Sequence, residues 1–167
     1  MENETVVENK KQLIVNKIDN GIVIDHITPA GTAFFVLQAL KIDNHYPHSV
    51  FVAINVSSKR LGRKDVLKIR NIKESDLNLE MLGLLIAGSN LVVIEDYKII
   101  RKVRLETPEY IRGLFQCPGH SCITRLHEDV EPEFKVIKGN GTNESVKLRC
   151  IYCDKIFDVF QSLAMVS

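Results

Sequence analysis

The segments "CPGHSC" (117–122) and "CIYC" (150–153) contain all four cysteines of this 167-residue chain. The tight turn within each segment can bring two sulfurs to one metal ion. Between them, "EFKVIKG" (133–139) and "ESVKLRC" (144–150) alternate in polarity and are joined by a hairpin signal, Asn-Gly. This hairpin would fold one cysteine turn against the other. We therefore expect one zinc ion bound by Cys117, Cys122, Cys150 and Cys153.

The expected zinc ion is structural rather than catalytic, because four thiolates leave no coordination position for a substrate. The cysteine-containing segment is too short for a large hydrophobic core, so metal binding would supply part of its folding free energy. His120 and His127 lie nearby and are expected to be surface residues. The spacing leaves two alternatives open, namely four unpaired buried thiols and a dithiol redox site.

The composition is typical of a soluble globular protein, with 45% hydrophobic and 26% charged residues. No apolar run approaches the ~20 residues of a membrane-spanning helix. The polar start "MENETVVENKKQ" (1–12) does not resemble a secretory signal. We therefore expect a cytoplasmic protein in a reducing compartment, where paired cysteines favour metal binding over disulfides. The net charge of +1 argues against a dedicated nucleic-acid-binding protein.

The N-terminal part of the chain predicts an α+β fold. The segment "TPAGTAFFVLQALK" (28–41) has helical periodicity with Thr28 as a candidate N-cap, and a second helix is expected from about Ser75 to Gly88. Short β-branched runs surround both helices, as in a ferredoxin-like antiparallel sheet with the helices on one face. The expected strands are 13–18, 22–27, 49–56, 63–72, 90–95 and 97–103.

Pro108 predicts a boundary after the last of these strands. The cysteine segments and their hairpin follow it, which predicts a small all-β domain like a zinc ribbon. The expected organisation is a flexible leader (1–12), an α+β domain (13–104) and a zinc-binding domain (105–167).

Several lysines could form a cationic surface on the predicted sheet. Lys64 and Lys68 would share one face of a strand, and Lys102 belongs to a later strand. Such a face can hold a polyanionic phosphate, although a solvated outer face is the ordinary explanation. Asp25 and His26 end a strand, where polar side chains are usually solvated. The residues alone predict no catalytic set.

Four segments occur in an order and spacing that resemble the regulatory chain of aspartate carbamoyltransferase. They are "GIVIDHI" (21–27), "GRKDVLKIRN" (62–71), "IEDYKIIRK" (94–102) and the cysteine block "CPGHSCI…LRCIYCDKIF". The resemblance implies a non-catalytic subunit that regulates pyrimidine biosynthesis. It implies an N-terminal domain that binds CTP or ATP as allosteric effectors and forms a homodimer, and a zinc domain that docks on the catalytic chain.

The resemblance also implies which residues bind the nucleotide. Lys68 would lie near the ribose and Lys102 near the phosphates, while backbone groups around Ile18 and Tyr97 would read the base. Val92 stands where the family often has Asn, which removes a possible hydrogen bond worth ~1 kcal/mol and bears on effector preference. The implied binding residues are Ile18, Asp25, His26, Lys68, Ile94, Tyr97, Ile99 and Lys102, with Val66 as further apolar lining.

Two other classes of function fit the cysteine block. A zinc-ribbon nucleic-acid-binding adaptor would use its basic residues Lys135, Lys138, Lys147 and Arg149, and its binding would weaken steeply with salt. A small redox enzyme would use one cysteine pair and would contain a thiol of depressed pKa.

Overall fold

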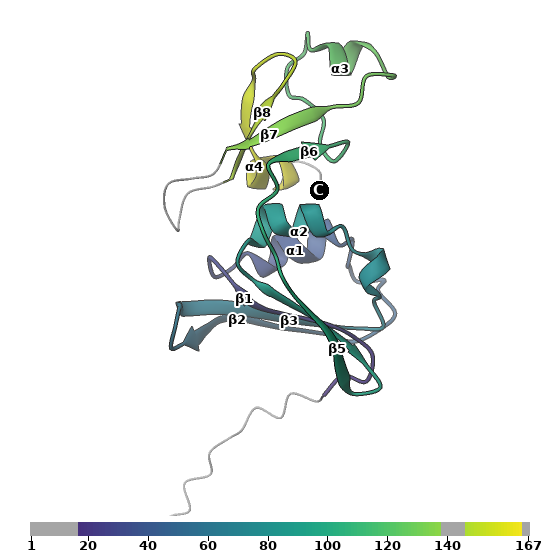
Figure 1. Cartoon of the computed structure of the whole chain (residues 1–167), viewed down its shortest axis with the longest axis vertical. Coiled ribbons are helices and arrows are strands. Elements are labelled where there is room, and N and C mark those ends of the chain that lie inside the picture. The colour runs from purple at the N-terminus through teal and green to yellow at the C-terminus, as the bar shows by residue number, and fades with distance from the viewer. Residues whose placement is uncertain (1–16, 138–145, 165–167) are drawn as a thin grey trace, which may run out of the picture.

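The computed structural model describes residues 17–137 and 146–164, and its regular elements form two antiparallel sheets. The two sheets are stacked along the long axis of the molecule, with helices between them (Figure 1). The larger sheet comes from the N-terminal part of the chain and the smaller sheet carries the C-terminal cysteine block. This arrangement confirms the predicted α+β class with a small β unit at the C-terminal end.

The larger sheet has the strand order of a ferredoxin-like fold with one strand added at an edge. Its order is β2-β3-β1-β4-β5, and every neighbouring pair is antiparallel. The strands are β1 (Gly21–Ile27), β2 (Val50–Ser58), β3 (Gly62–Arg70), β4 (Asn90–Glu95) and β5 (Lys98–Arg104). The helical elements are α1 (Ala33–Ala39), the 3-10 turn η1 (Glu74–Asp76) and α2 (Leu79–Ile86).

The smaller sheet has the order β6-β7-β8-β9 and is also antiparallel. Phe134 in β7 is fully buried and packs edge-on against Phe157 in β9, with ring centroids 5.2 Å apart. The strands are β6 (Tyr110–Arg112), β7 (Glu133–Ile137), β8 (Lys147–Cys150) and β9 (Ile156–Asp158), and the helices are α3 (Ile123–Leu126) and α4 (Val159–Ala164).

The two faces of the larger sheet differ because its strands alternate in polarity. In β3, Asp65, Leu67 and Ile69 are buried, while Lys64 and Lys68 point to the other side and are half-buried, as the sequence predicts. Helices α1 and α2 cover the buried side, and no helix covers the other side in the described part of the chain (Figure 1). We call this second side the open face.

Helix α1 begins at Ala33, so the predicted start at Thr28 and Pro29 is wrong. Gly31 has a left-handed φ of 98°, and Thr32 takes the N-cap position without a side-chain cap. The carboxylate of Asp65 accepts hydrogen bonds from the N–H groups of Gly31 and Ala33 at 2.7 and 3.1 Å. A residue far away in the sequence therefore caps this helix.

Helix α2 also begins later than the sequence predicts. Ser75 lies in the 3-10 turn, and Asn78 is the N-cap because its Oδ1 accepts a hydrogen bond from Met81 N at 2.9 Å. The predicted stop is correct, since the helix ends at Ile86, just before Gly88 with a φ of 86°.

Two predicted hairpins fall partly outside the described residues. The first hairpin would pair residues 13–18 with β1, but only Lys17 and Ile18 of that segment are described, and neither is in a strand. The second hairpin joins β7 and β8, and its predicted turn, Asn140-Gly141, lies outside the described residues. The predicted β4–β5 hairpin is present, and Asp96 and Tyr97 at its turn have left-handed φ values of 47° and 63°.

The two units meet through a short linker and through α4. The linker runs from Leu105, after β5, to Glu109, before β6. In α4, Phe160 packs against Phe35 of α1 with ring centroids 4.9 Å apart, and Gln38 Nε2 donates to the Leu163 carbonyl at 2.7 Å. Of the helices in the described ranges, none has the length and apolar character required to cross a bilayer.

Candidate functional site

The four cysteines converge at one point of the smaller unit, although they come from two distant turns. All four Sγ atoms lie within 4.8 Å of one another. The Sγ–Sγ distances are 3.4 Å between Cys117 and Cys153 and 3.7 Å between Cys122 and Cys150. Each close pair therefore joins one cysteine from each turn, as the hairpin prediction requires.

Local contacts hold the cysteine turns in shape. Gly119 N donates to Cys117 Sγ at 3.4 Å, and a Cβ at Gly119 would lie 3.3 Å from Cys153 Sγ, so the turn closes tightly over the sulfurs. Burial raises the pKa of the Cys117 thiol to about 12. Burial also disfavours the Cys122 thiolate, but hydrogen bonds from the Thr124 side chain and backbone outweigh it and lower the pKa of Cys122 to about 7.

This donor set fits a structural metal ion. Tetrahedral zinc takes four thiolate sulfurs at about 2.3 Å, which places the sulfurs roughly 3.8 Å from one another, close to the distances here. Sulfurs more than 3 Å apart are not disulfide-bonded, since that bond is about 2.05 Å long. His120 and His127 are exposed, as predicted for surface residues. The cluster could hold zinc through sulfur alone.

The open face of the larger sheet gathers most of the predicted nucleotide-binding residues. One row of directly paired residues crosses the whole sheet. Lys68 pairs with Phe51 and with Val23, Val23 with Val92, and Val92 with Lys102. Paired residues point to the same side of a sheet, so two lysines flank an apolar floor. The lysine backbones are three strand spacings apart, about 14 Å.

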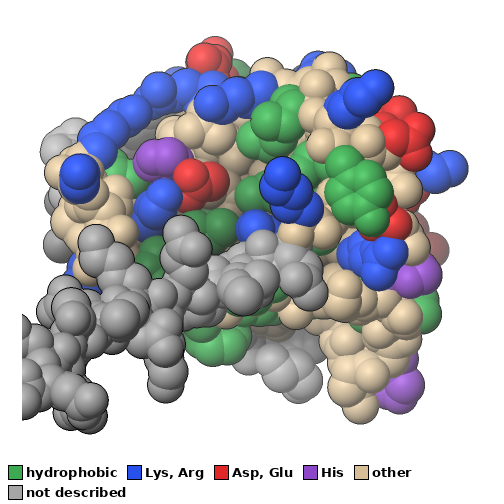
Figure 2. All heavy atoms as spheres, turned by 90° about the horizontal axis from the view of Figure 1, so that it is seen from below, with side chains coloured by type: hydrophobic (Ala, Val, Ile, Leu, Met, Phe, Trp, Pro, Cys, Tyr) green, Lys and Arg blue, Asp and Glu red, His purple; other side chains and the backbone are tan. Residues whose placement is uncertain are grey.

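The rows on either side of this lysine row differ in character. On one side, Gly21 pairs with Ile94, and Ile94 pairs with Ile99, whose side chain is exposed. On the other side lies Asp25, four residues from Gly21 along β1, a distance of about 14 Å. Along the strands, the side chains of the open face are therefore apolar in the first row, cationic in the second, and both acidic and basic at the far end. Figure 2 views this face, and Lys and Arg dominate its visible charged side chains.

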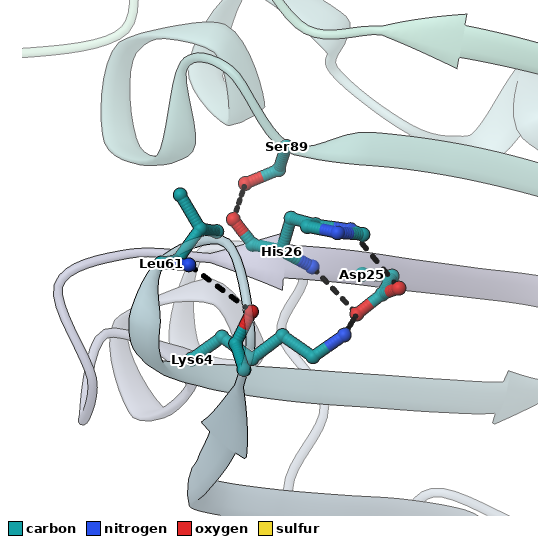
Figure 3. A network of polar contacts seen from close by, with 6 residues as sticks. Asp25, His26, Leu61, Lys64 and Ser89 are labelled. Atoms are coloured by element: carbon teal, nitrogen blue, oxygen red, sulfur yellow. Dashed lines mark hydrogen bonds and ion pairs between the residues drawn. The ribbon is translucent and has the colours of Figure 1, made fainter.

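Asp25, His26 and Lys64 form a compact polar network at the end of β1 (Figure 3). Lys64 Nζ lies 2.7 Å from Asp25 Oδ1, and both side chains are largely buried, with 18% and 30% exposure. His26 N donates to the same Oδ1 at 2.7 Å. Burial raises the pKa of Asp25, but Lys64 and the His26 N–H outweigh it, so the pKa stays below its usual value.

The histidine of this network has an unusual conformation. His26 has a left-handed φ of 64°, and its buried Nδ1 lies 3.0 Å from Asp25 Oδ2 without the angles of a hydrogen bond. The two side chains therefore lie close together without a hydrogen bond between them. The backbone carbonyl of His26 accepts a hydrogen bond from the buried Ser89 hydroxyl at 3.2 Å.

Two lysines of the open face remain free for a ligand. Within the described ranges, neither Lys68 nor Lys102 forms an ion pair, and Lys68 Nζ lies 5.9 Å from the centre of the Phe51 ring. Lys64, in contrast, is already paired with Asp25. The alternation of β3 correctly predicts the face on which Lys64 lies. Its ion pair with Asp25 could not be predicted, because the two residues are far apart in the sequence.

Ile18 lies in the segment before β1, and Tyr97 lies in the turn between β4 and β5. Tyr97 N donates to the Asp19 carbonyl at 2.9 Å, which brings the segment after Ile18 against the β4–β5 turn. Arg70 fixes this segment by two hydrogen bonds to the Asp19 carboxylate, at 2.7 and 2.6 Å, and these lower the pKa of Asp19 to about 2. Sequence reasoning had not identified this Arg70–Asp19 pair.

The chain matches two family models. The aspartate carbamoyltransferase regulatory chain, allosteric domain, matches residues 13–106, and the metal binding domain of the same regulatory chain matches residues 109–161. The boundary between the two matches lies within the linker.

Similar full-length proteins have the same description. The chain is 37% identical over 158 residues to the aspartate carbamoyltransferase regulatory chain of Sulfolobus acidocaldarius, which covers 95% of this chain and 93% of that relative. It is 41% identical to the regulatory chains of Haloarcula marismortui, over 89% of this chain and 91% of the relative, and of Aeropyrum pernix, over 84% and 87%. The chain therefore belongs to the aspartate carbamoyltransferase regulatory chain family, whose members are non-catalytic subunits with an allosteric and a metal-binding domain.

Proposed function

We propose that this regulatory chain binds CTP and ATP on the open face and transmits their binding to a catalytic chain through its zinc-containing unit. In this proposal, residues 13–104 form the nucleotide-binding domain and residues 105–167 the docking domain. The metal is one structural zinc ion held by the four cysteines. The proposed nucleotide site consists of Ile18, Asp25, His26, Lys68, Ile94, Tyr97, Ile99 and Lys102.

The change of chemistry along the open face carries this proposal. A nucleoside triphosphate has an aromatic base at one end and a polyanion at the other. Ile94 and Ile99 suit the base. Lys68 and Lys102 have no ionic partner among the described residues, so that Lys68 can bind the ribose and Lys102 can neutralise the phosphates. Asp25 keeps Lys64 in place beside them. The same polarity gradient thus matches the two ends of the ligand.

Calorimetric titration of CTP and of ATP into the purified chain tests the nucleotide site. We expect saturable binding by the wild type and an affinity at least roughly tenfold lower for Lys102→Ala, because a hydrogen bond to a charged group contributes about 1.5–3 kcal/mol. Lys98→Ala is the matched control, since Lys98 lies on the same strand but pairs with Glu95 on the other side of the sheet. Undetectable binding of both nucleotides at millimolar concentration would refute the proposal.

Exposed apolar side chains around the cysteine cluster support docking of this unit on a catalytic chain. Each is at least 45% exposed, although each belongs to a residue type that is usually buried. They surround the turns that the metal would fix, so metal binding and docking would be coupled. The side chains are Ile123, Leu126, Ile151, Tyr152 and Ile156.

We propose that the homodimer forms through the edge strand β2. The two edges of the larger sheet differ in charge: β5 carries the basic residues Lys98, Arg101, Lys102 and Arg104, whereas β2 carries no charged residue. Charged edge strands resist pairing with another strand, and an uncharged edge is available for it. Two copies of β2 can pair across a two-fold axis and join the sheets.

Size-exclusion chromatography with light scattering tests whether β2 forms the dimer interface. Ala53→Lys places a charge in the middle of β2 and is expected to give a monomer, because two like charges would meet near the two-fold axis. Ile100→Lys makes the same kind of change on β5, at a side chain that is 54% exposed, and should leave the dimer intact. The opposite pattern, with Ile100→Lys monomeric and Ala53→Lys dimeric, would move the interface to β5.

The family membership favours this regulatory function over a nucleic-acid-binding adaptor. The hairpin of the smaller unit does carry basic residues, but Lys135 is engaged with the Tyr110 ring, its Nζ lying 5.9 Å from the ring centre. Together with the net charge of +1, this provides little free positive charge for phosphate backbones.

A further inference from the structure

We propose that Ser89 is the residue through which the nucleotide site acts on the linker between the two units. This inference rests on the proposed nucleotide-binding function and adds the route of regulation. Ser89 is not itself one of the proposed nucleotide-binding residues, but it contacts one of them, His26, through its hydroxyl. Its side chain is fully buried between α2 and β4.

The side chain of Ser89 is bonded to the nucleotide side of the molecule. Its hydroxyl donates to the carbonyl oxygen of His26 at 3.2 Å. His26 has a left-handed φ of 64°, a conformation that is uncommon for non-glycine residues. Its N–H is bonded to Asp25, which is paired with Lys64 (Figure 3). A phosphate that moves Asp25 or Lys64 would therefore turn the His26 peptide and change its bond to Ser89.

The backbone of Ser89 is bonded to the linker. Its carbonyl accepts the N–H of Leu105 at 2.9 Å, and the N–H of Gly88, the preceding residue, donates to the Leu105 carbonyl at 2.8 Å. Leu105 is the first residue after β5 and is itself buried. The start of the linker is thus fixed on both sides by residues 88 and 89, so a shift of Ser89 must shift Leu105.

The next residue of the linker rests directly on a helix. A Cβ added to Gly83 in α2 would collide with the backbone carbonyl of Glu106. The absence of a side chain at Gly83 therefore permits the close approach of the linker to α2. Ser89 lies three residues after the end of α2, and its N–H donates to Ile86 O at 3.1 Å, so the helix end, Ser89 and the linker form one hydrogen-bonded joint.

A second connection between the units bypasses Ser89. It is the contact of α1 with α4 through the Phe35–Phe160 rings and the Gln38–Leu163 hydrogen bond. The α1 connection holds the units together over a surface, whereas the Ser89 joint is linked by successive hydrogen bonds to His26. The two routes make different predictions for substitutions.

The test compares Ser89→Ala with the wild type in the assembled enzyme. We expect the nucleotide-induced shift of the half-saturating aspartate concentration to fall by roughly 2- to 30-fold, the range for residues that modulate coupling, while the nucleotide Kd from calorimetry stays unchanged. Ser89→Cys keeps a weak donor of similar size and should retain part of the response, which also provides a variant in case Ser89→Ala folds poorly. Gly83→Ala, which displaces the linker from α2, should weaken the response as well.

Thr32→Val is the matched control for these substitutions. Thr32 is also buried, and its hydroxyl donates to the Pro29 carbonyl at 2.6 Å, away from the linker. We expect this variant to respond like the wild type. A Ser89→Ala enzyme with a wild-type response, or loss of the response in Thr32→Val alone, would overturn the proposal in favour of the α1 route. Failure of the wild-type chain to bind nucleotide would instead refute the proposed function.

Amide hydrogen exchange provides a readout that does not depend on activity. Addition of CTP to the wild-type chain should change the exchange rate of the Leu105 amide, because this amide donates to Ser89. The same addition should leave the rate unchanged in Ser89→Ala. An unchanged Leu105 rate in nucleotide-saturated wild type would contradict the proposed route.

Discussion

Replacement of Cys150 by serine is expected to release the metal ion and to separate the regulatory chain from its catalytic partner. Cys150 is fully buried at the end of β8, and its Sγ lies 3.7 Å from that of Cys122. A structural zinc site contributes an apparent 10–16 kcal/mol in small zinc-dependent peptides. The described strands and helices of the smaller unit are all short, and their packing could not replace this contribution.

Two measurements check this expectation. The zinc content of the purified chain should fall from one ion per chain to near zero, and the variant should no longer elute with the catalytic subunit in size-exclusion chromatography. Nucleotide binding should persist, since the open face belongs to the other sheet. His120→Ala is the control: this exposed histidine lies within the first cysteine turn, and its loss should affect neither metal nor association. A Cys150→Ser chain that keeps its zinc and its partner would contradict the structural role of the cluster.

The cysteine cluster could be predicted from the sequence because it depends on local spacing. A turn of the CPGHSC type brings its two sulfurs together on its own, and the polarity of the intervening strands predicts the hairpin that joins the two turns. The faces of β3 were predicted for the same reason, since alternation along one strand decides them. Side chains of a strand alternate between its two faces, which decides the faces to which Lys64, Asp65 and Lys68 point.

Contacts between distant segments were not predictable in this way. The start of α1 depends on the carboxylate of Asp65, which comes from β3, and no nearby residue signals it. The pairing of Lys64 with Asp25 likewise requires that β1 and β3 be neighbours. The strand order of the sheet decides such contacts, and local propensity contains no information about it.

Asp65→Ala is expected to destabilise the larger unit by about 3 kcal/mol or more, the largest effect we expect from a single substitution outside the metal centre. The Asp65 side chain is fully buried and accepts three backbone hydrogen bonds: from Gly31 at 2.7 Å, from Ala33 at 3.1 Å and from Asn55 at 2.8 Å. Without the carboxylate, these donors lose their acceptor. The Ala33 N–H is buried, and a buried unsatisfied group costs about 1–3 kcal/mol, to which the loss of the two part-buried hydrogen bonds adds.

The three donors come from two parts of the fold, so the loss should extend beyond one helix end. Gly31 and Ala33 lie at the start of α1, while Asn55 has a left-handed φ of 57° within the irregular part of the β2–β3 pairing. Asp65 thus holds α1 and the bulge of β2 on the same strand. We expect a lower urea midpoint at saturating zinc. The slope of the unfolding free energy against urea concentration should stay unchanged, because the substitution changes the stability and not the surface exposed on unfolding.

The controls for this substitution separate charge from hydrogen bonding. Asp65→Asn keeps one carbonyl-type oxygen but places an NH2 group against a backbone donor, so its midpoint should lie between those of the wild type and Asp65→Ala. Asp43→Ala removes an exposed aspartate whose Oδ1 accepts only the nearby His45 N–H, and it should change the midpoint very little. If Asp65→Ala unfolded at the wild-type midpoint, the buried carboxylate could not be the link between α1 and β2, because water would have to satisfy the N–H groups of Gly31, Ala33 and Asn55 at no cost. Such a result would mean that water reaches the end of the sheet at which Lys64 is paired with Asp25.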